Sequence, residues 1–467
     1  MLGSAAVKAT YWVLAVSLAA CGSDDSITPD AGPQYPTIEE EAQRTGDPAA
    51  GRDYLINGGY ITCGIPKAVY DRVLGGGAPE ITGRTGANAN LPYNYSVATS
   101  SEGIEVVSAN CLSCHAGRLN GQVMIGLGGS DADFTGDQAQ LVQAASNLQM
   151  TPTERTAMLR FLDRIKAIAP YTRTLTVGVN PADNLTAALM SHRDPVTLAW
   201  SNTPAIPLPP PLVVPVDVPP WWRMAKKHSM FYSAAGRGDH ARIMMAASLL
   251  CTDTVAEAQA IDAKFTDVRA YLETIEPPKW PWAIDMALAA EGKKVFEITC
   301  SRCHGTYGDG GSYPNHIVPI AEIGTDPILA QGASQFGPRY VEWFAKSFWG
   351  QTSRLEPTEV YVPPPLDGIW ATAPFLHNGS VPTIEALLDS TKRPRQWTRT
   401  FDSSDYDRAA VGWKFTVAVP HAQEPDEMKR TRIYDTTKFG YGNQGHTFGD
   451  ALEPEERTAV LEYLKTL

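Results

Sequence analysis

The sequence predicts a mainly α-helical protein with two helical modules in tandem and long loops between the helices. Three observations support this fold class. The pentapeptide Cys-x-x-Cys-His occurs twice, at residues 111–115 and 300–304. Apolar residues recur at helical spacing in segments of both halves of the chain. A proline-rich break at residues 277–282 separates the two halves and ends any helix that enters it.

The repeated pentapeptide has the spacing of a c-type haem attachment site. Two thiols one helical turn apart react with the porphyrin, and the adjacent imidazole reaches the iron. The alternatives are a redox cysteine pair or half of a zinc site, but a zinc site needs a second ligand pair close by. The sequence therefore predicts two covalently bound haem c groups, with these cofactor-binding residues: Cys111, Cys114, His115, Cys300, Cys303 and His304.

Composition sets limits on the function. The chain has 467 residues, of which 43% are apolar, which is enough for two or three domains with real cores. Its 51 acidic and 39 basic residues give a net charge of −12, so nucleic acid is not an expected partner. An acidic surface suits docking to a small basic redox protein that donates or accepts electrons.

Residues 1–20 resemble a bacterial lipoprotein signal peptide. Lys8 precedes an apolar run at residues 11–19, and Cys21 follows small residues at the cleavage position. The run is too short to span a bilayer, but lipid on Cys21 would anchor the chain to a membrane. Gly22 fits sorting to an outer membrane. The predicted location is therefore outside the cytoplasm, at the outer membrane facing the periplasm or at the cell surface. An ordinary cleaved signal with an incidental Cys21 is the alternative.

Two cysteines remain after lipid and haem attachment, Cys63 and Cys251. In an oxidising compartment they form a disulfide, or else they are two buried free thiols that behave as small apolar residues. The spacing does not decide between these alternatives. Residues 21–45 are rich in Ser, Asp, Pro, Glu and Thr, which predicts a flexible tether.

The N-terminal module is predicted at residues 46–278. Helices are expected from Asp47, over residues 153–169, around residues 242–250 and over residues 262–275. Between them, residues 202–220 contain eight prolines and must form an extended strap. The strap runs into Trp221 and Trp222, which favours a wall that lines a pocket.

The C-terminal module is predicted at residues 279–467. Residues 287–296 have the pattern of a helix that leads into the second pentapeptide. The acidic segment at residues 453–456 is a helix start signal, and the apolar residues after it predict a last helix. Both helices resemble the first and last helices of a class I cytochrome c.

Residues 364–380, which read PPLDGIWATAPFLHNGS, resemble the dihaem cytochrome c peroxidase superfamily. The chain is most similar to the haem-type rubber-oxygenase branch, with support from residues 305–307, 323–326, 337–340 and 440–446. The resemblance covers roughly residues 100–467. It implies two tandem class I cytochrome c-like haem domains, with haem 1 in the N-terminal module and haem 2 in the C-terminal module.

The resemblance also implies how haem 2 is ligated. In the peroxidases a methionine fourteen residues after the histidine of the Thr-Ala-Pro-x-x-His element binds the iron, but that position is Thr391 here. A histidine near the C-terminus replaces it in the oxygenase-like branch, and His446 matches that position. The predicted metal ligands are therefore His304 and His446 for haem 2, and His115 for haem 1. His377 is expected to be structural or to contact a propionate.

Haem 1 is expected to keep an open coordination position. No histidine occurs in residues 116–150, and Met124 lies in an apolar run that is typical of a core. The acidic stretch that serves O–O cleavage in the peroxidases is missing. An apolar lid is expected instead, with Trp222 and Phe231 as the catalytic residues, although a tryptophan between the haems would suit an electron relay equally. His192, His228 and His240 lie among charged neighbours, which favours solvated side chains.

These features predict a membrane-tethered dihaem c-type oxidoreductase. Haem 1 would bind O₂ or H₂O₂ beside an apolar unsaturated substrate, and haem 2 would transfer electrons. The alternatives are a dihaem cytochrome c peroxidase and a non-catalytic electron-transfer cytochrome. The peroxidases also hold a calcium ion between their domains, so the resemblance implies Ca²⁺ near Thr372.

Overall fold

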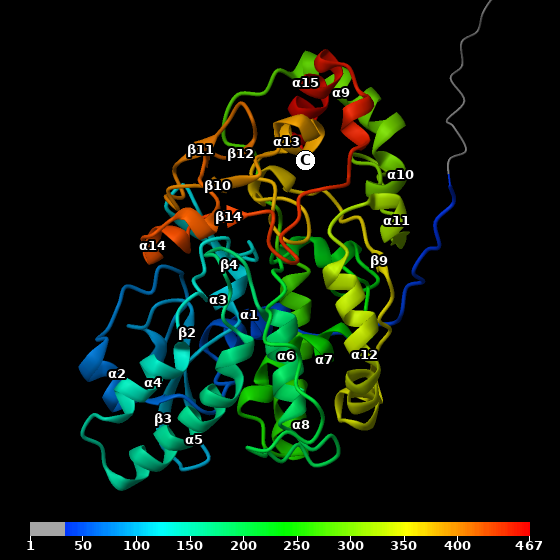
Figure 1. Cartoon of the computed structure of the whole chain (residues 1–467). Coiled ribbons are helices and arrows are strands. Elements are labelled where there is room, and N and C mark those ends of the chain that lie inside the picture. Colours follow the sequence, from blue (N-terminus) through cyan, green and yellow to red (C-terminus); the bar gives the residue numbers. More distant parts are fainter. Residues whose placement is uncertain (1–32) are drawn as a thin grey trace, which may run out of the picture. The chain divides into compact units, whose positions relative to one another are not determined.

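Helices make up most of the regular structure in the computed structural model, which describes residues 33–467 (Figure 1). The predicted mainly α class is confirmed. The long helices are α5 (Pro152–Ile168), α8 (Val255–Leu272), α9 (Met286–Thr299) and α12 (Ile328–Lys346). The shorter ones are α1 (Pro48–Asn57), α2 (Lys67–Val73), α3 (Leu112–His115), α4 (Gln138–Ser146), α6 (Ala182–Ser191), α7 (His240–Met244), α10 (Ser301–His304), α11 (Ile320–Ile323), α13 (Ile384–Leu388), α14 (Glu427–Arg430) and α15 (Pro454–Leu464).

Short strands pair into small antiparallel sheets. Within residues 33–467, two sheets have three strands, in the orders β1-β3-β2 and β13-β10-β14, and the others are the pairs β4-β5, β6-β8, β7-β9 and β11-β12. In the first sheet Val107 faces both Ile65 and Val97. The strand bounds are β1 (Ile65–Pro66), β2 (Tyr95–Thr99), β3 (Glu105–Ala109), β4 (Ala116–Leu119), β5 (Gln122–Ile125), β6 (Gly236–Gly238), β7 (Val318–Pro319), β8 (Ser353–Leu355), β9 (Val360–Tyr361), β10 (Gln396–Thr398), β11 (Tyr406–Asp407), β12 (Gly412–Trp413), β13 (Thr416–Val417) and β14 (Tyr434–Asp435).

Two pairs of helices cross with their backbones in close contact, one pair in each half of the chain. Helix α1 crosses α8 at Gly51, where an added Cβ would lie 1.8 Å from the carbonyl oxygen of Asp267. Helix α9 crosses α15 at Gly292, where it would lie 1.9 Å from the carbonyl oxygen of Ala459. Any side chain larger than hydrogen would collide with the facing backbone, so glycine is required at both crossings.

Helix starts follow the capping signals in the sequence. Thr151 and Glu154 form a capping box at the start of α5, and Glu453 and Glu456 form one at the start of α15. Both helices therefore begin where the sequence predicted. The helix expected at residues 262–275 begins earlier, at the start of α8, because a further capping box precedes it. The helix expected at 242–250 is the short α7 followed by a 3₁₀ helix, Met245–Leu250.

The proline-rich segment at residues 202–220 is extended, as predicted. Its only β-bridge within the described structure joins Val216 and Asn180. Helix α6 holds it in place, because the Asn184 side chain donates to the carbonyl of Pro210 (3.1 Å) and accepts from the amide of Val214 (3.3 Å). The strap is therefore fixed to the body along much of its length.

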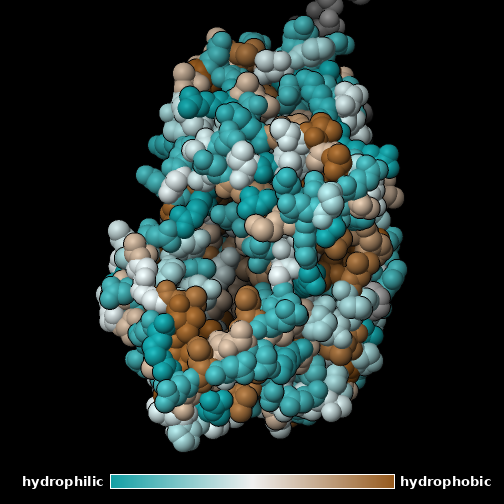
Figure 2. Space-filling model, turned by 60° about the vertical axis from the view of Figure 1, so that its left-hand side comes forward, coloured by the Kyte–Doolittle hydropathy of each residue, from teal (hydrophilic) through white to brown (hydrophobic). Residues whose placement is uncertain are grey.

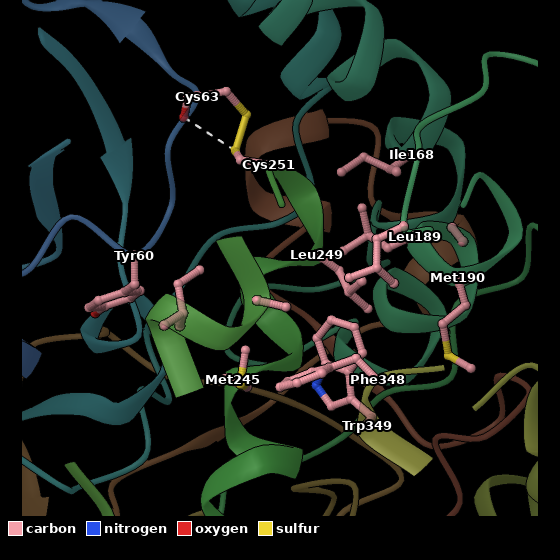
Figure 3. Close-up of a cluster of buried hydrophobic side chains, with 14 of the residues drawn as sticks. Tyr60, Cys63, Ile168, Leu189, Met190, Met245, Leu249, Cys251, Phe348 and Trp349 are labelled. Carbon is pink, nitrogen blue, oxygen red and sulfur yellow. Dashed lines mark hydrogen bonds between the residues drawn. A yellow bond between two sulfur atoms is a disulfide. The ribbon is translucent and has the colours of Figure 1, made fainter. Parts of the chain in front are cut away.

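A large apolar core surrounds a disulfide between Cys63 and Cys251 (Figure 3). Leu189 and Met190 from α6 and Phe348 and Trp349 after α12 belong to the same cluster. Of the two possibilities that the sequence left open for these cysteines, the disulfide is the one formed. It joins positions 188 residues apart, so it closes a large loop in the unfolded chain.

Replacing both cysteines with serine should lower the free energy of unfolding by about 2–5 kcal/mol, because the unfolded chain regains the freedom of that loop. Urea unfolding of the oxidised protein and the double variant measures the difference. The reduced wild-type protein is the matched control and should resemble the variant. The same urea midpoint for the double variant and the oxidised wild-type protein would contradict a stabilising role for the disulfide.

The predicted signal peptide, residues 1–20, and Cys21 lie outside the described residues. Of the predicted tether, residues 35–45 pack onto the body. Ile38 is 3% exposed, and Arg44 forms ion pairs with Asp239 and Asp262, both at 2.7 Å. Residues 35–467 form one compact unit, and the module boundary at residue 278 stays a prediction. No helix within residues 33–467 combines the length and apolar character that a membrane span requires.

Candidate functional site

The first Cys-x-x-Cys-His motif forms the short helix α3 directly after β3. Asn110 fixes the turn between them, because its side chain accepts from the amide of Leu112 and donates to the carbonyl of Tyr93, both at 2.9 Å. The amide of Cys111 donates to the Tyr60 hydroxyl (3.1 Å). Burial raises the pKa of the Cys111 thiol to about 11, so this thiol is protonated at neutral pH.

His115 ends α3 and stacks on Trp221, with ring centroids 4.5 Å apart and ring planes 15° apart. Its Nδ1 atom is buried and has no hydrogen-bond partner among the described residues. Burial lowers the pKa of His115 to about 4, so the ring is neutral at neutral pH. A neutral imidazole with free nitrogen atoms is suited to bind a metal ion.

A cavity of about 1690 Å³ opens beside this motif, and Cys111, Cys114 and His115 line it. Most of its wall is apolar and comes from α2, α4, α5, α6, α8, α12 and the strap. Pockets for single small ligands measure roughly 300–1,000 Å³. The cavity is therefore larger than one such ligand would fill.

The second motif forms α10, which follows α9 without a break. The Nδ1 atom of His304 donates to the carbonyl of Pro364 (2.8 Å), so Nε2 is the unprotonated nitrogen and is available as a ligand. The rings of His304 and His446 face each other with centroids 6.1 Å apart and planes at 60°.

The loop that carries His446 is held firmly. Arg393 donates to the carbonyls of Gly445 (2.6 Å) and His446 (3.0 Å), and the His446 amide donates to the carbonyl of Ile323 (2.7 Å). His446 has a positive φ of 46°, which a non-glycine residue rarely adopts. Its Nδ1 is buried without a partner, and burial, followed by the charges of His304 and Arg393, lowers its pKa to about 3.

Both motifs fit a haem group. Two imidazoles that bind one metal ion from opposite sides, with each nitrogen about 2 Å from the metal, have centroids roughly 6 Å apart. The separation of His304 and His446 matches this value. At the first motif, the neutral, buried His115 faces a cavity that also receives both cysteines. No cluster of three or more His, Cys, Asp or Glu residues within residues 33–467 suggests another metal site, and calcium near Thr372 stays a prediction.

The two residues predicted to be catalytic lie in different places. Phe231 lines the cavity and is 41% exposed. Trp222 does not line it. Its indole nitrogen donates to the carbonyl of Asp367 (2.8 Å), and its ring belongs to the apolar cluster around the second motif. Its neighbour Trp221 does line the cavity, as do Trp343 and Trp349.

The remaining histidines are more buried than their charged neighbours suggested. His192 and His240 are 3% and 4% exposed, so the expectation of solvated side chains is wrong for these two. His192 stacks on Trp200, and His240 lines the cavity. His377 stacks on Tyr361, whose hydroxyl lies 3.2 Å from its Nε2, and this contact supports a structural role.

The polar residues Asp217, Tyr232 and Lys227 also line the cavity, and no sequence motif marked Asp217 or Lys227 as site residues. The Tyr232 hydroxyl donates to the Asp217 carboxyl group (3.0 Å). Burial raises the pKa of Asp217 to about 8, a rise that the Tyr232 hydrogen bond and the Arg223 charge only partly offset. Asp217 is therefore largely protonated at neutral pH.

Comparison with known protein families identifies part of the second half. Residues 360–398 match the family described as RoxA-like, cytochrome c-like. This segment is similar to RoxA-like cytochrome c domains. The matched segment includes Pro364, whose carbonyl accepts the hydrogen bond from His304, and His377. A cytochrome c-like domain implies covalently bound haem c, so this match supports the presence of haem c in the chain.

Two curated proteins of Sinorhizobium fredii (strain NBRC 101917 / NGR234) are similar to the chain. The uncharacterized protein y4iJ is 31% identical over 288 residues, which cover 47% of this chain and 46% of that protein. The uncharacterized protein y4iM is 28% identical over 327 residues, which cover 61% of this chain and 71% of that protein. The chain thus spans less than half the length of y4iJ.

Proposed function

We propose that the protein is a dihaem oxidoreductase with one closed and one open haem. In this proposal His304 and His446 would both be ligands of haem 2, which would supply electron transfer. His115 would be the protein ligand of haem 1, and the cavity beside His115 would admit O₂ or H₂O₂ and an apolar unsaturated substrate. The RoxA-like cytochrome c domain supports the haem chemistry.

The observation that carries the proposal is the difference between the two motifs. His304 has a second imidazole opposite it, with the ring centroids 6.1 Å apart. His115 instead opens on a cavity of about 1690 Å³. Since the sixth ligand controls access to a haem iron, this difference supports ligand binding at the first motif and electron transfer at the second.

At the first motif, side chains of the chain prepare the reaction space. A bound haem would supply one-electron and O₂ chemistry there. Trp221 fixes the plane of His115 by stacking on it, and Met230 and Phe231 provide apolar wall for a substrate. Asp217 holds a proton on its carboxyl group at neutral pH and lies in the same cavity, so it is the candidate proton donor for reduced oxygen.

Trp221 and Trp222 support electron transfer between the two sites. These neighbouring residues lie in the 3₁₀ helix Trp221–Lys226. Trp221 stacks on His115, and Trp222 belongs to the apolar cluster around the second motif, which also includes Phe296 of α9. Two adjacent indole rings, one at each site, suit a relay for single electrons.

Carbon monoxide tests the proposal, because it binds only to ferrous haem with a free coordination position. We expect one CO bound per chain at saturation, measured by optical titration of the dithionite-reduced protein. The pyridine haemochrome assay measures the haem content, which we expect to be two haems per chain, so that the bound CO can be expressed per haem. The oxidised protein is the control and should bind none. Binding of no CO would favour a plain electron carrier, and binding of two would contradict a closed haem 2.

Turnover separates the remaining alternatives. A peroxidase would consume H₂O₂ with electrons from a reduced small cytochrome, and replacing Asp217 with asparagine should then lower the rate by roughly 10²-fold or more, as loss of a general acid does. An oxygenase would consume O₂ and form carbonyl products from an unsaturated apolar substrate.

For the location we propose that a lipid on Cys21 anchors the protein to a membrane outside the cytoplasm, where a small redox protein could dock.

A further inference from the structure

A single basic side chain faces the cavity. Among the described residues that line the cavity, Lys227 is the only lysine or arginine. It follows the 3₁₀ helix Trp221–Lys226, four residues after Arg223. The wall is mostly apolar but includes four aspartates, Asp131, Asp133, Asp183 and Asp217, none of which forms an ion pair with Lys227 among the described residues.

The Lys227 ammonium lacks a counter-charge. No ion pair or hydrogen bond joins it to another residue within 33–467, whereas the neighbouring Lys226 pairs with Asp367 at 2.7 Å. His240, which feels the charge of Lys227, is itself neutral at neutral pH because burial, followed by the charges of Arg269 and Lys227, lowers its pKa to about 4. The nearby charge that acts on Lys227 is Arg223, which is also positive.

Arg223 adds to the positive potential. It is 5% exposed, and its Nη2 atom is buried without a hydrogen-bond partner among the described residues. Burial, together with the charge of Arg223, lowers the pKa of Lys227 to about 8, so most of the ammonium is still charged at neutral pH. The Lys227 side chain is half-buried. A charge that is partly removed from water and has no partner is unfavourable, and an anion at this position would reduce that penalty.

The shape of the cavity indicates what could carry that anion. Its volume exceeds that of a pocket for one small ligand. At its edge Leu74, directly after α2, and Leu141 of α4 are 61% and 71% exposed, and both belong to the lining. Figure 2, which brings that side of Figure 1 forward, shows hydrophobic side chains beside a hollow. An apolar chain could therefore enter past α2 and α4 and extend along the apolar wall.

We propose that Lys227 binds a carboxylate inside this cavity. The volume and the apolar edge favour the head group of a long-chain carboxylic acid, with its hydrocarbon chain along the apolar wall. A propionate of the porphyrin at the first motif presents the same chemistry and is the second source of the carboxylate. The proposal depends on the proposed function for the presence of haem 1, but it concerns binding and not turnover.

Calorimetric titration of the haem-loaded protein with oleate and with methyl oleate tests the first source, because the two ligands differ only in the charge of the head group. We expect oleate to bind at least tenfold more tightly than the ester. Lys227→Met should abolish this preference and Lys227→Arg should retain it. The matched control is Lys264→Met on an exposed face of α8, which should behave as wild type. Far-ultraviolet circular dichroism and haem content verify folding.

Redox titration of the same variants tests the second source. If the carboxylate belongs to the porphyrin, oleate and its ester bind equally, and Lys227→Met lowers the midpoint potential of haem 1, because loss of a nearby cation favours the ferric state. A tenfold change in the one-electron equilibrium corresponds to 59 mV. Equal binding with unchanged potentials would overturn the proposal. CO binding is measured on each sample because it reports whether haem 1 has a free coordination position. If the proposed function fails because haem 1 is closed, CO does not bind but oleate is still preferred over its ester.

Discussion

Replacing His446 with alanine is expected to raise CO binding from one to two molecules per chain. The second imidazole opposite His304 is then absent, so the iron of haem 2 would gain a free coordination position. Arg393 holds the loop through backbone carbonyls, which the substitution leaves in place. Optical titration of the reduced variant, with haem content measured in parallel, gives the stoichiometry.

The matched control for this experiment is His421→Ala. His421 lies in a short 3₁₀ helix, His421–Gln423, with no ring contact to His304. This variant should bind one CO and keep the wild-type spectrum. If His446→Ala also binds one CO and keeps the wild-type low-spin spectrum, His446 is not a ligand of haem 2.

Replacing Gly292 with valine should destabilise the protein by about 3 kcal/mol or more, which is the upper range for overpacking. A Cβ at this position would lie 1.9 Å from the carbonyl oxygen of Ala459, and two helix backbones cannot move apart without losing their shared core. Helix α9 leads directly into Cys300, so we expect lower haem occupancy at the second motif as well. Thermal unfolding and the pyridine haemochrome assay measure the two effects.

Gly332 of α12 provides the control for the crossing. A Cβ there meets no atom within 4 Å, so Gly332→Ala should leave the protein as stable as wild type or more stable, by up to about 1 kcal/mol, because alanine favours helix. Similar unfolding temperatures for Gly292→Val and Gly332→Ala would contradict the importance of the α9–α15 contact.

The features that the sequence predicted well depend on local chemistry. Helices α5 and α15 begin at capping boxes, which join residues three positions apart. The strap is extended because proline cannot continue a helix. The position of His446 opposite His304 was predicted from resemblance and not from spacing, because the two residues are far apart in the chain.

The features that the sequence did not predict depend on the packing of distant segments. Strands of two to five residues, such as β7 and β2, are too short to show a clear alternation of apolar and polar residues. The sequence indicated that Trp221 and Trp222 border a pocket but not which ring faces it, since that depends on a 3₁₀ helix. Lys227 looked like one of two adjacent surface lysines, and only the fold separates the paired Lys226 from the cavity-lining Lys227.

Electron paramagnetic resonance of the oxidised protein tests the central claim most directly, because spin state reports the axial ligands of each ferric haem. The proposal predicts two different signals from equal amounts of haem: a low-spin signal from haem 2, which His446→Ala removes, and a signal from haem 1 that changes when a small anionic ligand such as azide is added. Two low-spin signals that azide leaves unchanged would show that both irons carry two firm protein ligands, and this result would contradict an open haem 1.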